Sequence, residues 1–411
     1  MSNQEPLRDA LRHRAEQLGD THPLNLDDIK GRARGIRRRR AAVSGLAATA
    51  VLAVAVPMGI AVTDGIGTDP ENPPVAGPSA TPSEEGPPPD TGVKDGVLTT
   101  DVDAESYAPA IPYLYDGEVT LPDGGTIPVE GEWDELVALG ESGVVVADAG
   151  RQELQVVGPD GAVVATYPST GQLAGSADGS LVAYATPEGR LAVLTETGDQ
   201  QELPAVPDLQ TPDPVGISGS ESCDPEVDGG CVVYVTDAGE QPRGYSLTSK
   251  GIINPLADYR TLRDVSADGA VSGVVSVDDL GVEPGSCSEV RADAFDERPR
   301  WSTCDHTVDV FSPDSSLVVG LPAYLDGSGA GKLAILDASD GSVLGEWTNN
   351  AETQAFVAST AWDEDGTLLA TVFQQGSWSL MRFSPDGGLS KVQDLAGGDD
   401  VSAPMVLSTQ P

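Results

Sequence analysis

The stretch Ser176-Ala-Asp-Gly-Ser-Leu181, continued by Val-Ala-Tyr-Ala185, contains the pattern on which the fold prediction depends. The Asp-Gly pair is favoured in tight hairpin turns because glycine readily adopts the positive φ that these turns require. The apolar run after it has the length and the residue types of a buried strand. The stretch therefore predicts a hairpin turn that leads into a β-strand.

Copies of this turn recur along the chain at a nearly regular spacing. They are Ser266-Ala-Asp-Gly-Ala-Val271, Ser312-Pro-Asp-Ser-Ser-Leu317, Asp363-Glu-Asp-Gly-Thr-Leu368 and a divergent copy, Asp228-Gly-Gly-Cys-Val232. Starting from Asp178, the steps between their aspartates are 50, 40, 46 and 51 residues. A four-stranded propeller blade takes about 40–45 residues, and insertions in loops explain the excess. The alternative folds, a pair of β-sandwiches or a β-helix, do not predict this period.

The strand count predicts a closed ring. Six complete blades are expected near residues 136–167, 171–204, 214–254, 261–302, 307–347 and 356–393. Three strands near 111–129 precede them, and one strand, Val401 to Leu407, follows them. Unpaired, these strands would leave exposed ladder groups, so we expect them to pair as a seventh blade with Val401–Leu407 innermost. We predict an all-β, seven-bladed β-propeller, with a six-bladed ring as the alternative.

Two short motifs support this fold by resemblance. Phe311-Ser-Pro-Asp314 and Phe383-Ser-Pro-Asp-Gly387 are similar to the Phe-Ser-Pro-Asp-Gly signature of WD-repeat and TolB-like β-propellers. The resemblance covers roughly residues 107–408. It implies a fold more than a function, because propellers carry many unrelated activities.

An arginine cluster and an apolar segment precede the repeats. The cluster consists of Arg37, Arg38, Arg39 and Arg40. The next 23 residues, 41–63, carry no charge. At about 1.5 Å per residue, a helix of this length crosses a hydrocarbon core of roughly 30 Å. No Lys or Arg occurs in residues 64–93, so the arginines are a topogenic signal that predicts a cytoplasmic N-terminus.

These features divide the chain into four predicted regions. They are a basic cytoplasmic tail with short helices (1–40), a single transmembrane helix (41–63), a Pro-rich disordered linker (64–96) and an extracytoplasmic β-propeller (97–411). A cleaved signal peptide is the alternative to the anchor, but the region before the apolar run is longer than such peptides have. We expect the linker to hold the propeller away from the membrane.

The charge distribution excludes one class of partner. The chain has a formal net charge of −42, yet its first 40 residues carry a net +4. The remaining residues are therefore strongly acidic and will repel nucleic acid. Solubility or attraction of cationic partners remains as the reason for this charge.

All four cysteines follow the apolar segment. They are Cys223, Cys231, Cys287 and Cys304. An even number on one side of a membrane indicates disulfides in an oxidising compartment. The short separations favour Cys223–Cys231 and Cys287–Cys304, although two other connectivities remain open. A zinc site is not expected because CxxC spacing and clustered histidines are absent from the sequence.

No catalytic, cofactor-binding or metal-binding residue can be assigned. His306 is the single histidine after the linker, and no Gly-x-Ser-x-Gly elbow accompanies it. Gly327-Ser-Gly-Ala-Gly-Lys332 lacks the first glycine and the final Ser/Thr of a phosphate loop. Asp278-Asp279 and Asp363-Glu-Asp-Gly366 lack the further ligands of a calcium loop. A ring of charged residues at the central channel cannot be located from spacing alone.

Three functions fit this layout. The first is a membrane-anchored propeller that binds a protein, peptide or glycan outside the cell. The second is a membrane-bound sensor or regulator of an extracytoplasmic-function sigma factor, because the layout resembles such proteins of high-GC Gram-positive bacteria. The third is a propeller hydrolase. Co-purification of a sigma factor with the tail would favour the second, and hydrolase activity of the propeller would favour the third.

Overall fold

The computed structural model describes residues 94–408, except 105–106, 141–142, 149, 206–208, 220–222, 225, 227–229, 240–241, 257–258, 276–286, 297, 324–328 and 400–401. These residues form β-strands, turns and loops, with no α-helix among them. In this part of the chain, we find no helix long and apolar enough to span a bilayer. The predicted tail, transmembrane helix and topogenic arginines lie outside the described residues, as does the linker up to residue 93.

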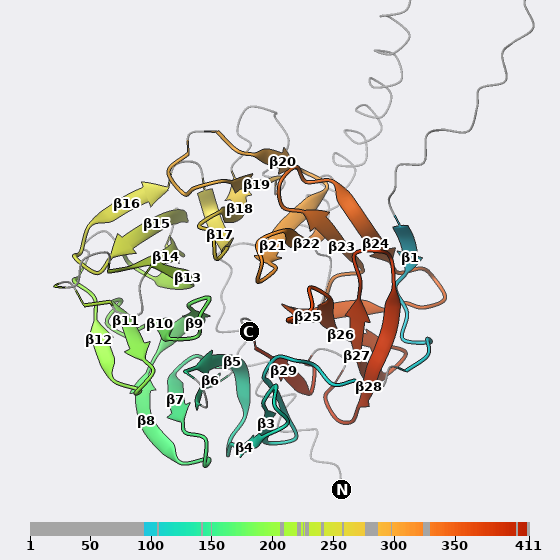
Figure 1. Ribbon diagram of the computed structural model, residues 1–411, viewed down its shortest axis with the longest axis horizontal. Coiled ribbons are helices and arrows are strands. Elements are labelled where there is room, and N and C mark those ends of the chain that lie inside the picture. Colours follow the sequence, from blue (N-terminus) through green and yellow to red (C-terminus); the bar gives the residue numbers. More distant parts are fainter. Residues whose placement is uncertain are drawn as a thin grey trace, which may run out of the picture. The chain divides into compact units, whose positions relative to one another are not determined.

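The described residues form seven sheets, or blades, around a central axis (Figure 1). Blade 1 contains β5 (Trp133–Leu139), β6 (Gly143–Asp148), β7 (Glu153–Val157) and β8 (Val163–Pro168). Blade 2 contains β9 (Thr170–Gly175), β10 (Leu181–Ala185), β11 (Leu191–Thr195) and β12 (Gln200–Glu202). Blade 3 contains β13 (Pro212–Gly219), β14 (Cys231–Asp237), β15 (Arg243–Thr248) and β16 (Ile253–Leu256). Blade 4 contains β17 (Tyr259–Val265), β18 (Val271–Val275), β19 (Cys287–Arg291) and β20 (Trp301–Thr303).

The last three blades complete the ring. Blade 5 contains β21 (His306–Phe311), β22 (Leu317–Pro322), β23 (Lys332–Asp337) and β24 (Val343–Thr348), with β1 (Lys94–Val97) added at its outer edge. Blade 6 contains β25 (Phe356–Trp362), β26 (Leu368–Gln374), β27 (Ser377–Phe383) and β28 (Leu389–Leu395). Blade 7 contains β29 (Met405–Leu407), β2 (Tyr113–Tyr115), β3 (Glu118–Thr120) and β4 (Thr126–Pro128). The prediction of a seven-bladed propeller is confirmed, and the six-bladed alternative is wrong.

The repeated Asp-Gly turn forms the predicted hairpin turn and joins the first two strands of a blade. In blade 2 the Ser176 hydroxyl donates to Asp178 Oδ1 at 2.6 Å and accepts from the Leu181 N–H at 3.0 Å. Gly179 takes a φ of 70° at the tip of this turn. In blade 5, Ser315 occupies the glycine position with a φ of 60°, which a non-glycine residue adopts at some cost. The Phe383 motif lies in a different hairpin, between β27 and β28.

The apolar core consists of seven clusters, each between two neighbouring blades. Blade 2, for example, contributes Tyr184 to the cluster with blade 1 and Ala183 to the cluster with blade 3. Each blade thus packs on both faces, and all five residues of β10 are buried. This two-sided packing explains why the inner strands have continuous apolar runs instead of alternation.

Ring closure pairs the two ends of the propeller. β29 runs antiparallel to β2, with Tyr113 opposite Leu407 and Tyr115 opposite Met405. The ladder extends one step further, because the Ser408 N–H donates to the Pro112 carbonyl at 3.0 Å. The strand is shorter than the predicted 401–407.

Side chains of β29 alternate between the two neighbouring blades. Met405 and Leu407 are buried in the cluster shared with blade 6. Val406, between them, packs in the cluster shared with blade 1. Pro404 precedes the strand, so its missing N–H costs no ladder bond. One short strand therefore connects blade 6 to blade 1.

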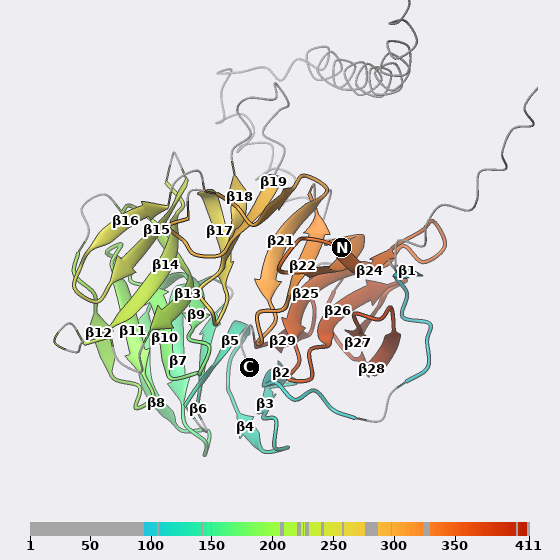
Figure 2. The same cartoon turned by 45° about the horizontal axis from the view of Figure 1, so that its top comes forward.

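A strap formed by residues 94–104 and 107–111 crosses blades 5 and 6 before entering blade 7 (Figure 2). It begins with β1, which pairs in parallel with β24. This strand corrects the predicted linker boundary, because residues 94–96 are paired and not part of a free spacer. Gly96 is needed there, since a Cβ atom would lie 2.5 Å from the buried Trp347 ring. Leu98 and Ile111 are fully buried at the two ends of the remaining strap.

A buried ion pair fixes the strap to blade 6. The Arg382 guanidinium contacts the Asp363 carboxylate, and both side chains are 2% exposed. The other Asp363 oxygen accepts from the Ala110 N–H at 2.8 Å, and the Tyr107 ring covers Arg382 with its centroid 4.1 Å away. Asp363-Glu-Asp-Gly366 therefore forms a turn and an anchor for the strap.

Two disulfides, Cys223–Cys231 and Cys287–Cys304, have the pairing favoured by the short separations. Cys231 begins β14, and Cys287 begins β19. Each bridge stays within one blade and ties a loop to it. Such bridges persist in oxidising compartments.

The first prediction tests ring closure. Deleting residues 400–411 from the full-length protein should lower the free energy of unfolding by several kcal/mol. The reason is that burying Met405 and Leu407 contributes about 1.5–3 kcal/mol each, before the ladder is counted. Denaturant unfolding measures the change, and a deletion of residues 409–411, which keeps β29, is the control. An unchanged midpoint in the longer deletion would show that β29 does not close the ring.

Candidate functional site

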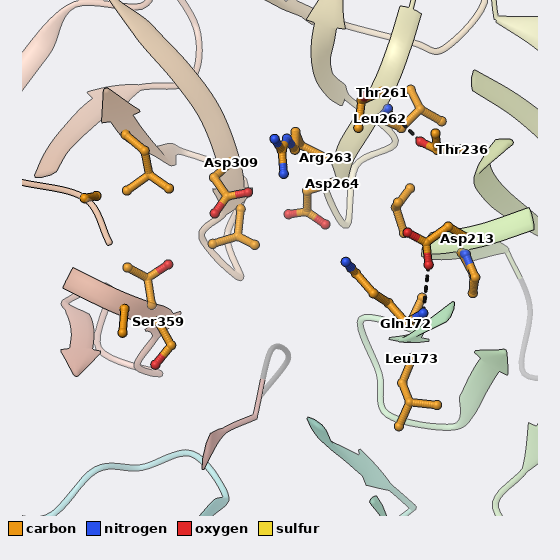
Figure 3. A pocket seen from close by; sticks show the side chains of 18 of the residues that line it. Gln172, Leu173, Asp213, Thr236, Thr261, Leu262, Arg263, Asp264, Asp309 and Ser359 are labelled. Atoms are coloured by element: carbon orange, nitrogen blue, oxygen red, sulfur yellow. Dashed lines mark hydrogen bonds between the residues drawn. The ribbon is translucent and has the colours of Figure 1, made fainter. Parts of the chain in front are cut away.

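A cavity of about 440 Å³ lies among the innermost strands of the propeller (Figure 3). Most of its wall comes from β9, β13, β17, β21 and β25, the first strands of blades 2 to 6. Thr236 of β14, Leu321 of β22 and residues 329–330 complete it. The polar side chains that line it include Gln172, Asp213, Arg263, Asp264, Asp309 and Ser359. No lining residue is aromatic. The cavity therefore offers charges and hydrogen-bonding groups, with aliphatic side chains between them.

Bulges explain how these polar side chains reach the cavity. The pairing of each of these innermost strands with the second strand of its blade contains a register shift. Arg263 lies at a shift between Leu262 and Asp264, and Asp309 lies between Val308 and Phe311. A bulge bends its strand and redirects side chains, and bulges are common beside functional sites.

Three carboxylates of innermost strands join neighbouring blades. Asp264 on β17 accepts from the Phe311 N–H of β21 at 2.7 Å. Asp213 on β13 accepts from the Gln172 N–H of β9 at 2.7 Å. On β5, outside the cavity lining, Glu135 accepts from the Leu173 N–H at 2.7 Å. These bonds satisfy backbone N–H groups of the neighbouring blades and position the cavity walls.

Burial shifts the pKa values of these carboxyl groups. It raises the pKa of Asp264 to about 7, although the Phe311 and Val265 N–H groups oppose the shift. Burial also raises the pKa of Glu135 to about 7, against the opposing effects of the Leu173 N–H and of Arg151. The pKa of Asp309 is raised by burial as well, and the Arg263 charge opposes this. Burial therefore disfavours the ionised form of each of these carboxyl groups.

Asp309 and Arg263 differ from the other charged residues of the cavity. Neither side chain makes a hydrogen bond or an ion pair with any described residue, and only their mutual charge interaction links them. The Asp309 backbone, in contrast, is held by the Ser272 hydroxyl, which donates to its carbonyl at 3.0 Å. An acceptor and a donor thus remain available at one place in the cavity wall. This arrangement suits binding of a polar group.

The residues considered from sequence lie elsewhere. His306 is buried in blade 5, with Nε2 3.3 Å from Glu346, and burial lowers the pKa of the imidazole. Lys332, from the glycine-rich stretch, pairs with the same Glu346 carboxylate at 2.6 Å. Asp278-Asp279 and Arg37 to Arg40 lie outside the described residues. Within the described part of the chain, no group of three His, Cys, Asp or Glu side chains is arranged to hold a metal ion.

Sequence reasoning missed the cavity residues. One signal could have indicated them: Arg263-Asp264 is a charged pair between the buried residues Leu262 and Val265. Of the two, Asp264 is buried, and charged side chains are rarely buried without a partner or a role.

The chain resembles known proteins in structure but not in sequence. No family model and no curated protein matches it. A chain of the mitotic checkpoint complex crystal structure is similar with a TM-score of 0.46 and 15% identity, covering 82% of this chain and 90% of that one. A functionally unknown protein from Desulfotomaculum acetoxidans DSM 771 has a TM-score of 0.45 and 11% identity, covering 73% and 99%. The RRP9 WD40 repeats have a TM-score of 0.44 and 11% identity, covering 64% and 82%.

The second prediction concerns pH. A carboxyl group with a raised pKa binds more protons in the folded chain than in the unfolded chain, so stability falls as pH rises between the two pKa values. For Glu135 this window runs from about 4.5 to about 7, and the fall is on the order of a few kcal/mol at about 1.4 kcal/mol per pKa unit. The glutamine of Glu135→Gln is neutral at every pH, so this variant should lose the part of the stability decrease that Glu135 causes.

Denaturant midpoints at about pH 5 and about pH 7.5, on either side of most of this window, measure the effect. Glu188→Gln, at an exposed turn residue, changes the net charge equally and is the control. If Glu135→Gln kept the pH dependence of the unsubstituted protein, the burial argument would be wrong.

Proposed function

We propose that this chain is a membrane-anchored, extracytoplasmic binding module whose propeller accepts part of a protein or peptide in its axial cavity. The observation that supports this most is the pair Asp309 and Arg263, which face the cavity without a hydrogen-bonding partner among the described residues. Asp309 is half-buried, so its carboxylate is partly desolvated and would gain from a bound partner. Propellers commonly serve as protein-binding scaffolds, and this analogy favours a macromolecular partner.

The proposed placement rests on the sequence before the propeller. Residues 41–63 would cross the membrane, Arg37 to Arg40 would keep the tail in the cytoplasm, and the Pro-rich stretch that follows would space the propeller from the bilayer. The two disulfides support this placement, because they indicate an oxidising compartment.

The third prediction tests partner binding and placement together. A photo-cross-linking amino acid replaces Ala358, an exposed residue of the cavity wall, in the full-length protein. Intact cells are irradiated and then treated with a protease that cannot cross the membrane. We expect a propeller fragment enlarged by a cross-linked partner to appear in the medium, because the protease should cut the exposed linker.

A cross-linker at Thr166, exposed on outer strand β8, is the control. No adduct at Ala358 beyond that control would contradict cavity binding. An adduct that resists external protease would contradict the extracytoplasmic placement.

A further inference from the structure

The charge of the cavity restricts what it can bind, given the proposed function as its basis. Its lining contains three carboxylates, Asp213, Asp264 and Asp309, and one cation, Arg263. The chain beyond residue 40 is strongly acidic as well. A field of this sign attracts cationic groups and repels anionic ones.

The three carboxylates differ in how many of their oxygens remain available to a ligand. Asp264 is buried, and both of its oxygens accept backbone N–H groups, from Phe311 and from Val265, each at 2.7 Å. Asp213 uses one oxygen for the Gln172 N–H. Asp309 uses neither oxygen in a hydrogen bond with a described residue, although its side chain is half-buried. Asp309 is therefore the carboxylate of this lining with both oxygens available to a ligand.

Arg263 places a positive charge near Asp309 but does not bond to the Asp309 carboxylate oxygens. It opposes the raised pKa of Asp309, yet no ion pair joins the two side chains. The Arg263 side chain is exposed, and Figure 3 shows it beside Asp309 and Asp264. A ligand cation that bonded directly to Asp309 would make the stronger contact, because charge-assisted hydrogen bonds need contact distance.

We infer that the cavity binds one basic side chain, a lysine ammonium or an arginine guanidinium, presented by a peptide segment, with Asp309 as its principal acceptor. The aliphatic stem of such a side chain fits the apolar part of the wall, which includes Leu173, Val310 and Val357. The cavity volume of about 440 Å³ accommodates a long side chain together with water. Arg263 competes with the ligand for Asp309, so it weakens binding.

Because of this competition, two substitutions should change ligand binding in opposite directions. Asp309→Asn removes the acceptor charge and should abolish the preference for a basic side chain. Arg263→Gln removes the competing cation and should strengthen binding of the same ligand several-fold. A merely structural role for these residues would weaken binding in both variants.

The experiment uses the full-length protein in nanodiscs and blocked pentapeptides of alanine with lysine, norleucine or glutamate at the centre. Titration calorimetry should show the lysine peptide binding at least about tenfold more tightly than the norleucine peptide, the size expected for a charge-assisted hydrogen bond. Asp305→Asn, at an exposed residue just before β21, changes the charge equally and is the control variant. Melting temperatures confirm that each variant is folded.

Equal binding of the lysine and norleucine peptides would overturn the inference, and so would weaker binding by Arg263→Gln. Spermidine is the probe for a free polyamine, and binding of spermidine without the lysine peptide would overturn the peptide assignment. If an adduct formed at Ala358 in cells while the lysine preference was absent, the proposed function would stand and this inference alone would fail.

Discussion

The pairing of β29 with β2 is the constraint on which the rest of the propeller depends. Six blades are built from consecutive strands, so they could form without the chain ends. The seventh needs Met405–Leu407 from one end and Tyr113–Tyr115 from the other. Without that pairing, blades 6 and 1 would each expose an apolar face to water, and β2 would expose an unpaired edge. Closure also determines how the innermost strands approach one another, and the innermost strands of blades 2 to 6 line the cavity.

The strap reinforces the same closure from outside. β1 caps the outer edge of blade 5, and Asp363 with Arg382 holds the following segment on blade 6. A buried ion pair contributes little net stability by itself, but removing one partner leaves an uncompensated buried charge. The pair is therefore better understood as a device that specifies where the strap lies. Because the strap leads directly into β2, its position helps to bring β2 beside β29.

Much of this architecture follows from local sequence. Turns such as Ser176–Leu181 can be recognised from the sequence, because serine, aspartate and glycine each have one role in the turn. The strand count around them predicts seven blades, and short cysteine separations predict the disulfides. The strap strand Lys94–Val97 could not be predicted, because it is short, polar and stabilised by an edge far away in sequence. The cavity residues could not be predicted for another reason. Bulges at positions such as Arg263 and Asp309 break the alternation that would assign each side chain to one face of the sheet.

Native-state hydrogen exchange tests the central claim, that the β2–β29 pairing belongs to the cooperative unit, most directly. Opening free energies of amides in β29 and β2 are compared with those in β26, a central strand of blade 6. If closure holds the ring together, amides of all three strands should exchange only through the same global unfolding. Exchange of the β29 amides through a much less costly local opening, while β26 stayed protected, would contradict the claim.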